Sequence, residues 1–109
     1  MQIHFDASAG ELTAKLCGEI DHHCAGALRS EIDAAIYTHI PKTLVLDFSG
    51  VSFMDSSGIG LIMGRYRILQ PLGGGIILQD PPAHISRVLR LAGMERLARI
   101  RSSRKEAVS

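Results

Sequence analysis

Residues 45–61 read Val45-Leu46-Asp47-Phe48-Ser49-Gly50-Val51-Ser52-Phe53-Met54-Asp55-Ser56-Ser57-Gly58-Ile59-Gly60-Leu61. A β-strand pattern runs into an acid and two hydroxyl residues, and the apolar residues that follow have a helical period. Ser56 is therefore predicted to lie on a short loop at the start of a helix, beside Asp55. A phosphate on its hydroxyl would face free backbone N–H groups and the positive end of the helix dipole. The segment indicates a switch residue that another protein phosphorylates.

Upstream of this stretch, the pattern predicts two strands, a helix and a third strand. Residues 2–8 and 11–18 alternate around a turn, which is typical of a β-hairpin. Asp21 precedes a helical pattern and is expected to cap that helix. Pro41 ends the region after the helix, and Thr43 to Phe48 is predicted to be a strand buried on both faces. The inward residues of the helix are expected to be Leu28, Ile32, Ala35 and Ile36.

The next helix is predicted to run from about Ser57 to Leu69, with an apolar face of Ile59, Ile62, Met63 and Tyr66. Leu61 lies off this face and is expected to be an exposed apolar contact. Glycine inside a helix costs about 1 kcal/mol relative to alanine. Either close packing against the protein's own sheet or close approach of a partner backbone or a nucleotide would offset that cost here. The helical glycines concerned are Gly58, Gly60 and Gly64.

Downstream, a strand at Ile76 to Leu78 precedes a third helix that Pro81-Pro82 opens. Gly93 is expected to stop that helix, and residues 97–100 are predicted to form a last short strand. Residues 102–109 are polar and are expected to fray or form a short helix. The predicted inward residues of the third helix are Ile85, Val88, Leu89 and Ala92. The order β-β-α-β-α-β-α-β favours a single α/β domain over residues 1–109, with a mixed sheet and parallel crossovers.

Composition limits the partners. The 109 residues include 12 Lys and Arg against 11 Asp and Glu, a formal net charge of +1, which argues against nucleic acid as the main partner. The segment from Arg65 onward is basic, which indicates either a solvated flank or a docking surface for an acidic partner or a nucleotide phosphate. No apolar run approaches the roughly 20 residues of a membrane span, and no signal peptide is expected. Cys17 and Cys24 are therefore predicted to be reduced thiols in the cytoplasm.

Three catalytic or binding chemistries are disfavoured. The segment around Ser56 lacks the G-x-S-x-G elbow of a serine hydrolase and a second acid–base constellation. Asp21-His22-His23 lacks the spacing of a metal site, since adjacent residues do not point at one ion. Gly73-Gly74-Gly75 precedes a strand and lacks the G-K-[ST] ending of a phosphate loop, so it indicates a turn. No cofactor or metal is expected.

Several segments together resemble the STAS domain family of bacterial anti-sigma factor antagonists, and most closely its sporulation type. The matching segments are Gly18-Glu19-Ile20-Asp21-His22-His23, Ser52-Phe53-Met54-Asp55-Ser56-Ser57-Gly58-Ile59-Gly60, Gly64-Arg65-Tyr66 and Leu91-Ala92-Gly93-Met94. The resemblance spans residues 3 to about 101. It implies a mixed β-sheet packed mainly on one face by helices.

The resemblance also implies a regulatory circuit. The unphosphorylated antagonist binds a cognate anti-sigma factor and frees a sigma factor. The anti-sigma factor is also a serine kinase that uses ATP, and a PP2C-type phosphatase resets the antagonist. The family's phosphorylation site falls on Ser56. The predicted partner-binding residues are Asp21, His23, Asp55, Ser57, Gly58, Gly60, Leu61 and Arg65.

Two other functions remain open at this point. A STAS subunit of a lipid-transport or stress-sensing assembly would use the same helix as a docking face. A small serine esterase-like enzyme would use Ser56 as its nucleophile. If the chain is an anti-sigma factor antagonist, we expect it to have no enzymatic activity of its own. We also expect it to contact neither nucleic acid nor a membrane directly.

Overall fold

The computed structural model describes residues 2–103, which form a single α/β domain. The elements follow the predicted order, with a short 3-10 helix (η1) added before the last strand. They are β1 (Gln2–Ser8), β2 (Glu11–Ile20), α1 (Ala25–His39), β3 (Thr43–Met54), α2 (Ser56–Leu69), β4 (Gly75–Gln79), α3 (Ala83–Leu91), η1 (Met94–Arg96) and β5 (Arg99–Arg101). Of the tail predicted to fray or form a short helix, residues 104–109 lie outside the described residues. No helix between residues 2 and 103 is long and apolar enough to cross a membrane.

The sheet is mixed, with strand order β1-β2-β3-β4-β5. The β1–β2 pair is antiparallel and is joined by a tight turn in which Ala9 and Gly10 both have positive φ, +51° and +81°. The other three pairs are parallel, so each needs a crossover, and α1, α2 and α3 supply them. The predicted mixed sheet with parallel crossovers is confirmed.

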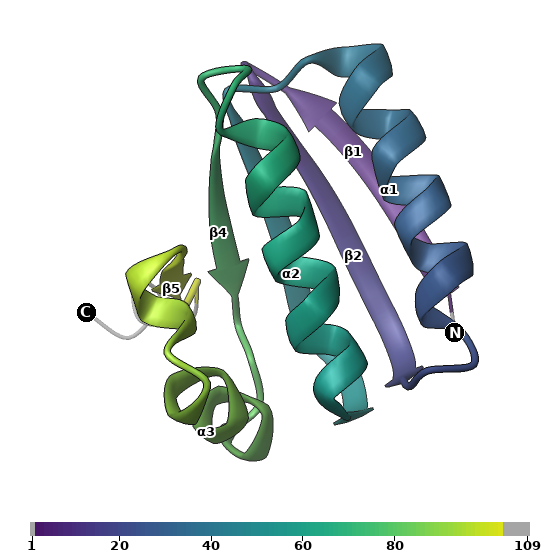
Figure 1. Cartoon of the computed structure of the whole chain (residues 1–109), viewed down its shortest axis with the longest axis vertical. Coiled ribbons are helices and arrows are strands. Elements are labelled where there is room, and N and C mark those ends of the chain that lie inside the picture. Colours follow the sequence, from purple (N-terminus) through teal and green to yellow (C-terminus); the bar gives the residue numbers. More distant parts are fainter. Residues whose placement is uncertain (1, 104–109) are drawn as a thin grey trace.

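Helices α1 and α2 lie side by side across one face of the sheet, while α3 packs at the end near β5 (Figure 1). The core lies between the sheet and these helices. Leu28, Ile32 and Ile36 of α1 are all buried there, as predicted. In α3, Ile85 and Leu89 are buried, but Ala92 lies beyond the end of the helix and is exposed, so its predicted inward position is wrong. The helix ends at Leu91, because the chain turns into η1 through Gly93, whose φ is +75°.

Strand β3 is twice as long as the predicted segment, and its second half positions the functional segment. Only Thr43 to Asp47 pair with β4, whereas Gly50 to Met54 pair with the end of β2 alone. A Cβ at Gly50 would lie 2.8 Å from Cys17 Sγ and 3.1 Å from Leu16 O, so only glycine fits. The apolar pattern did not reveal this extension, because Ser49 and Gly50 are exposed and interrupt the run of apolar residues. The strand therefore ends at the edge of the domain where β2 also ends, and Asp55 follows it there.

Candidate functional site

Helix α2 begins with an aspartate cap. Asp55 is the N-cap residue, and its Oδ1 accepts a hydrogen bond of 2.8 Å from the Ser57 N–H. Ser56 is the first helical residue, is exposed, and makes no side-chain hydrogen bond within residues 2–103. The prediction that Ser56 lies on the loop before the helix is wrong by one residue, since α2 begins at Ser56. The Asp55 carboxylate, two residues before Ser57, satisfies the Ser57 N–H at this helix start.

The loop between β2 and α1 is held by Asp21. Its Oδ1 accepts hydrogen bonds from the His23 N–H at 2.9 Å and the Cys24 N–H at 3.1 Å. Burial raises the pKa of Asp21, but these backbone donors, with smaller contributions from the Cys24 thiol and His23, bring the pKa below its usual value. The N-cap of α1 is Cys24, which has no side-chain cap, so the prediction that Asp21 caps this helix is wrong. Asp21 instead stabilises the turn that leads into it.

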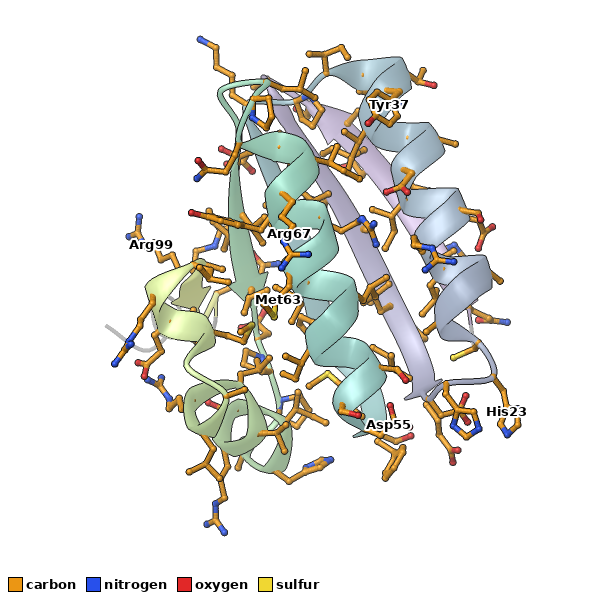
Figure 2. The ribbon with its side chains drawn as sticks, in the orientation of Figure 1. His23, Tyr37, Asp55, Met63, Arg67 and Arg99 are labelled. Atoms are coloured by element: carbon orange, nitrogen blue, oxygen red, sulfur yellow. The ribbon has the colours of Figure 1, made fainter. Side chains whose placement is uncertain are left out.

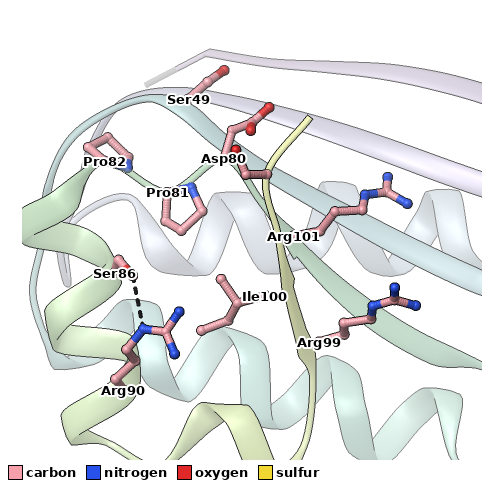
Figure 3. Close-up of a pocket in the computed structure, with 10 residues that line it drawn as sticks. Ser49, Asp80, Pro81, Pro82, Ser86, Arg90, Arg99, Ile100 and Arg101 are labelled. Atoms are coloured by element: carbon pink, nitrogen blue, oxygen red, sulfur yellow. Dashed lines mark hydrogen bonds between the residues drawn. The ribbon is translucent and has the colours of Figure 1, made fainter. Parts of the chain in front are cut away.

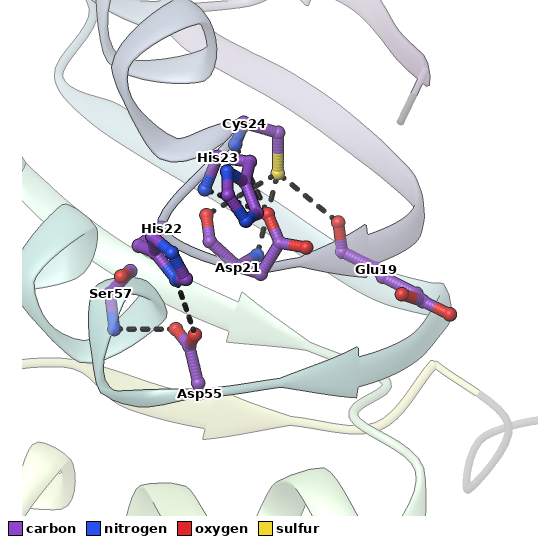
Figure 4. A network of polar contacts seen from close by, with 7 residues as sticks. All are labelled: Glu19, Asp21, His22, His23, Cys24, Asp55 and Ser57. Atoms are coloured by element: carbon purple, nitrogen blue, oxygen red, sulfur yellow. Dashed lines mark hydrogen bonds and ion pairs between the residues drawn. The ribbon is translucent and has the colours of Figure 1, made fainter.

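This loop lies directly beside the start of α2 (Figures 2 and 4). The Asp55 N–H donates to Ile20 O at 3.1 Å, which ties the end of β3 to the end of β2. His22 Nδ1 lies 3.8 Å from Asp55 Oδ2, and the rings of His22 and His23 are 4.0 Å apart between centroids. His22 therefore contacts the cap of α2, while the partner-binding role of His23 stays a prediction. Sequence pattern alone could not decide between two adjacent histidines, because the turn at Asp21 sets which ring points toward Asp55.

A groove of about 350 Å³ lies between the start of α1 and residues 57–65 of α2. Its wall on α2 carries two glycines with a common property. A Cβ at either Gly60 or Gly64 would meet no atom within 4 Å. A Cβ at Gly58, in contrast, would clash with the buried Met54 side chain. Gly58 is thus explained by packing within the domain, while Gly60 and Gly64 are not. The lining residues are Ala25, Arg29, Ser57, Gly60, Leu61, Gly64 and Arg65.

The predicted exposed contact at Leu61 is wrong, since this side chain is only 5% exposed. Leu61 lines the groove with Ala25 and Arg29 of α1, so the buried stripe of α2 extends beyond the predicted face toward α1. Ile62 is fully buried, whereas Ile59, Met63 and Tyr66 are partly buried against the core. Only the surface of Leu61 that lines the groove is accessible to a partner.

Arg65 is buried between the helices. Its Nε lies 2.7 Å from Asp33 Oδ1 of α1, in a close ion pair that is not a well-aligned hydrogen bond. Burial lowers the pKa of Arg65, the Asp33 carboxylate opposes that shift, and the neighbouring Arg29 adds to it. The guanidinium is engaged within the domain, so its role at the groove is to hold α1 beside α2. Arg29, which no sequence pattern singled out, is exposed and adds a positive charge to the groove lining.

The sequence matches the STAS domain over residues 3–107. The chain belongs to the STAS domain family. An anti-sigma F factor antagonist from Paenibacillus polymyxa is 34% identical over 111 residues, which cover 100% of this chain and 93% of the relative. The predicted family is confirmed.

Two solved structures support the same fold for this STAS domain. The anti-sigma factor antagonist SpoIIAA in its unphosphorylated form has a TM-score of 0.82 and 30% identity, with 98% of this chain and 93% of that chain covered. SpoIIAA of Bacillus in the phosphorylated form has a TM-score of 0.73 and 30% identity, with 98% and 96% covered. The α/β fold predicted from the sequence is therefore shared with both forms of that protein.

The polar contacts at this site of the STAS domain are those of a helix cap and a turn. Asp55 is used as a helix cap, and within residues 2–103 no hydrogen bond joins the Ser56 or Ser57 hydroxyl to a histidine. A nucleophilic serine needs a base within hydrogen-bond reach. Across the same residues, no group of three or more His, Cys, Asp or Glu side chains is arranged to hold a metal ion.

Proposed function

We propose that this STAS domain is an anti-sigma factor antagonist. Its unphosphorylated form binds a cognate anti-sigma factor and frees a sigma factor, and phosphorylation of Ser56 ends that binding. The observation that carries the proposal is the exposed Ser56 hydroxyl at the first position of α2, at the end of the domain that also holds the glycine-lined groove. The names of the relatives, which are anti-sigma factor antagonists, point in the same direction.

The serine kinase in this proposal is the anti-sigma factor itself, with ATP bound to it, and a PP2C-type phosphatase removes the phosphate. The antagonist acts in the cytoplasm by protein–protein binding, without a cofactor, and contacts neither nucleic acid nor membrane directly. It is a substrate of these enzymes and has no activity of its own. The existence of a phosphorylated form of the related SpoIIAA supports a phosphorylation switch in this chain.

Two contrasts favour Ser56 over Ser57 as the modified residue. Ser56 is exposed, whereas Ser57 is half-buried and lines the groove. The backbone of Ser57 is also fixed by its hydrogen bond to Asp55, which holds this residue in the first turn. A kinase must bring the hydroxyl to its ATP, and the exposed residue reaches an external site with less distortion of the helix.

The phosphate would act by its charge at the docking surface. A phosphoserine carries about −1.5 to −2 charges at pH 7, and here it would stand beside the Asp55 carboxylate. The positive end of the α2 dipole favours an anion at that position, so we expect the helix to stay folded after phosphorylation. An acidic group or a nucleotide phosphate on the partner would then be repelled, since charges of about −2 and −1 held ~5 Å apart repel by roughly 6 kcal/mol before screening, at an effective dielectric of ~20. A third of that repulsion weakens binding about 30-fold.

The proposal is tested by incubating the protein with its cognate anti-sigma factor and ATP and locating the phosphate by tandem mass spectrometry. We expect one phosphate, on Ser56. Ser57→Ala is the matched control, since it removes the neighbouring hydroxyl and should leave incorporation unchanged, whereas Ser56→Ala should abolish it. Phosphate found on Ser57, or retained by Ser56→Ala, would refute the assignment.

A further inference from the structure

The two edges of the sheet differ in how well they are protected against pairing with another strand. β5 has only three residues, and the side chains of Arg99 and Arg101 leave it on one side, with Ile100 on the other (Figure 3). A short, charged strand is a poor template for pairing. β1, at the opposite edge, has seven residues, pairs with β2 without a bulge, and contains neither proline nor lysine. Within residues 2–103, no strand pairs with its outer side.

The turn after β1 decides which backbone groups of this strand point outward. Ala9 and Gly10 form a two-residue loop with positive φ at both positions, so Ser8 and Glu11 are the pair that flanks it. In a turn of this kind the residue before the loop accepts a hydrogen bond from the residue after it. Hydrogen-bonded and non-hydrogen-bonded pairs then alternate along the antiparallel ladder. Every second residue of β1 therefore directs its N–H and C=O away from β2, and these residues are Ile3, Phe5 and Ala7.

The side chains of β1 are also left without partners at this edge. Phe5 lies opposite the fully buried Ala14, so it faces the side of the sheet that the helices cover, yet its side chain is 39% exposed. His4 and Asp6 point to the other face, which α1 and α2 leave uncovered (Figure 1). Both are exposed, and neither side chain makes a hydrogen bond or ion pair within residues 2–103. The edge therefore presents unpaired backbone groups, an aromatic ring and two unpaired polar side chains.

We propose that β1 pairs with β1 of a second copy of this chain, in antiparallel orientation and centred on Phe5. In this register Phe5 lies opposite Phe5 of the second copy, and Ile3 lies opposite Ala7. Apolar residues then meet apolar residues on the helix side. On the other face His4 lies opposite Asp6 twice, at the closely spaced pairs of the ladder, where side chains come nearest. The strand is thus complementary to itself on both faces.

The neighbouring registers are less favourable. A centre at Asp6 would place two carboxylates directly opposite each other, which is destabilising. A centre at His4 would lose the contact between histidine and carboxylate. Either shift would also leave two residues at one end of Gln2–Ser8 without a partner in the other β1, whereas the centre at Phe5 pairs all seven. The register is therefore set by charge and by length together.

The pairing leaves the proposed switch site accessible. No residue of β1 lines the groove between α1 and α2. Because the two copies run antiparallel, their Ser56 hydroxyls lie at opposite ends of the joined sheet. The dimer is therefore compatible with partner binding, and it can be tested without phosphorylation or an anti-sigma factor.

The experiment follows the full-length protein by sedimentation velocity from micromolar to millimolar concentration. We expect a weak monomer–dimer equilibrium, because one strand edge is a small contact. Amide hydrogen exchange of the same samples locates the interface. The outward N–H groups of Ile3, Phe5 and Ala7 should exchange more slowly as the dimer forms, since they then donate to the second copy.

Two charge variants test the register. Asp6→Lys places an ammonium group opposite His4, and His4→Asp places a carboxylate opposite Asp6, so each variant alone should dimerise about 10-fold more weakly. An equimolar mixture of the two should restore the dimer, because each introduced charge then faces its opposite. Arg99→Asp is the matched control, since it reverses an exposed charge at the other edge and should leave the equilibrium unchanged. Thermal unfolding of each variant checks that the fold is retained.

Three outcomes would overturn the proposal. One is a monomer at every concentration, with fast exchange at all three outward amides. Another is a dimer that Arg99→Asp weakens as much as Asp6→Lys does, which would place the interface elsewhere. The third is a mixture of the two charge variants that is no more dimeric than either variant alone, which would exclude this register.

Discussion

The two sides of α2 carry the same residue type for different reasons. On the sheet side, Gly58 is buried, and a Cβ there would collide with Met54. On the groove side, a Cβ at Gly60 or Gly64 would meet no atom of the described residues within 4 Å. A helical glycine costs about 1 kcal/mol relative to alanine, so packing explains that cost at Gly58 but not at these two positions. The proposed docking of a partner would explain it there.

The largest effect is expected at Leu61, on the boundary between these two sides. Leu61→Asp places a charge at a position that is only 5% exposed, and it should cost more than about 3 kcal/mol and unfold most of the protein. Leu91→Asp is the matched control, since Leu91 is 82% exposed and should tolerate the charge. Denaturant unfolding followed by circular dichroism compares them. An unfolding transition of Leu61→Asp like that of the parent protein would mean that Leu61 is more exposed at the groove than described.

Gly58→Ala should destabilise the domain by about 1–2 kcal/mol. The added Cβ forces Met54 to move, and this overpacking outweighs the gain in helix propensity. Gly60→Ala in the same helix provides the comparison, because it adds the same methyl group where there is room. If the two variants unfold at the same denaturant concentration, the distinction between the two sides of α2 is lost.

Gly60→Ala and Gly64→Ala should each stabilise the free protein by about 0.5–1 kcal/mol, through helix propensity alone. Both should weaken binding to the anti-sigma factor, since the methyl group enters the groove. Calorimetric titration and chemical unfolding of the same samples separate the effects. Higher stability with unchanged affinity would show that the partner does not approach this wall.

The smallest effect is expected at the exposed rim, in the loop held by Asp21. The folded state lowers the pKa of this carboxyl, so its contribution to stability is present above the unfolded value of 3.8 and is lost as the pH falls through the folded pKa. Asp21→Asn should therefore lower the stability slightly at pH 7, where the carboxylate contributes, and flatten the pH dependence of unfolding below about pH 4, where the parent protein has lost that contribution. A loss of stability at pH 3 as large as the loss at pH 7 would contradict this origin.

How far the sequence predicts this molecule depends on whether a feature is local. Element order, the hairpin and the buried faces of α1 and α3 follow from periodicity, which reports one element at a time. The position of Leu61 does not, because its burial comes from α1 packing alongside α2. The same holds for the Arg65–Asp33 pair between two helices.

Within the candidate site, the segment from Asp55 to Ser57 could be located from the sequence, but the roles inside it could not. A carboxylate and two hydroxyls compete for the same N–H groups, and only the geometry at the end of β3 gives the cap to Asp55. Likewise, His22 meets Asp55 because the Asp21 turn orients the loop.

The most direct test of the switch is the release of sigma factor from its complex with the anti-sigma factor. Ser56→Ala should release sigma as the unphosphorylated protein does, whereas Ser56→Asp should need about 30-fold more protein. Both should keep a native circular dichroism spectrum, and Ser57→Ala serves as the control for the neighbouring hydroxyl. Equal release by Ser56→Ala and Ser56→Asp would contradict the charge mechanism, and loss of structure in Ser56→Asp would contradict an unchanged fold.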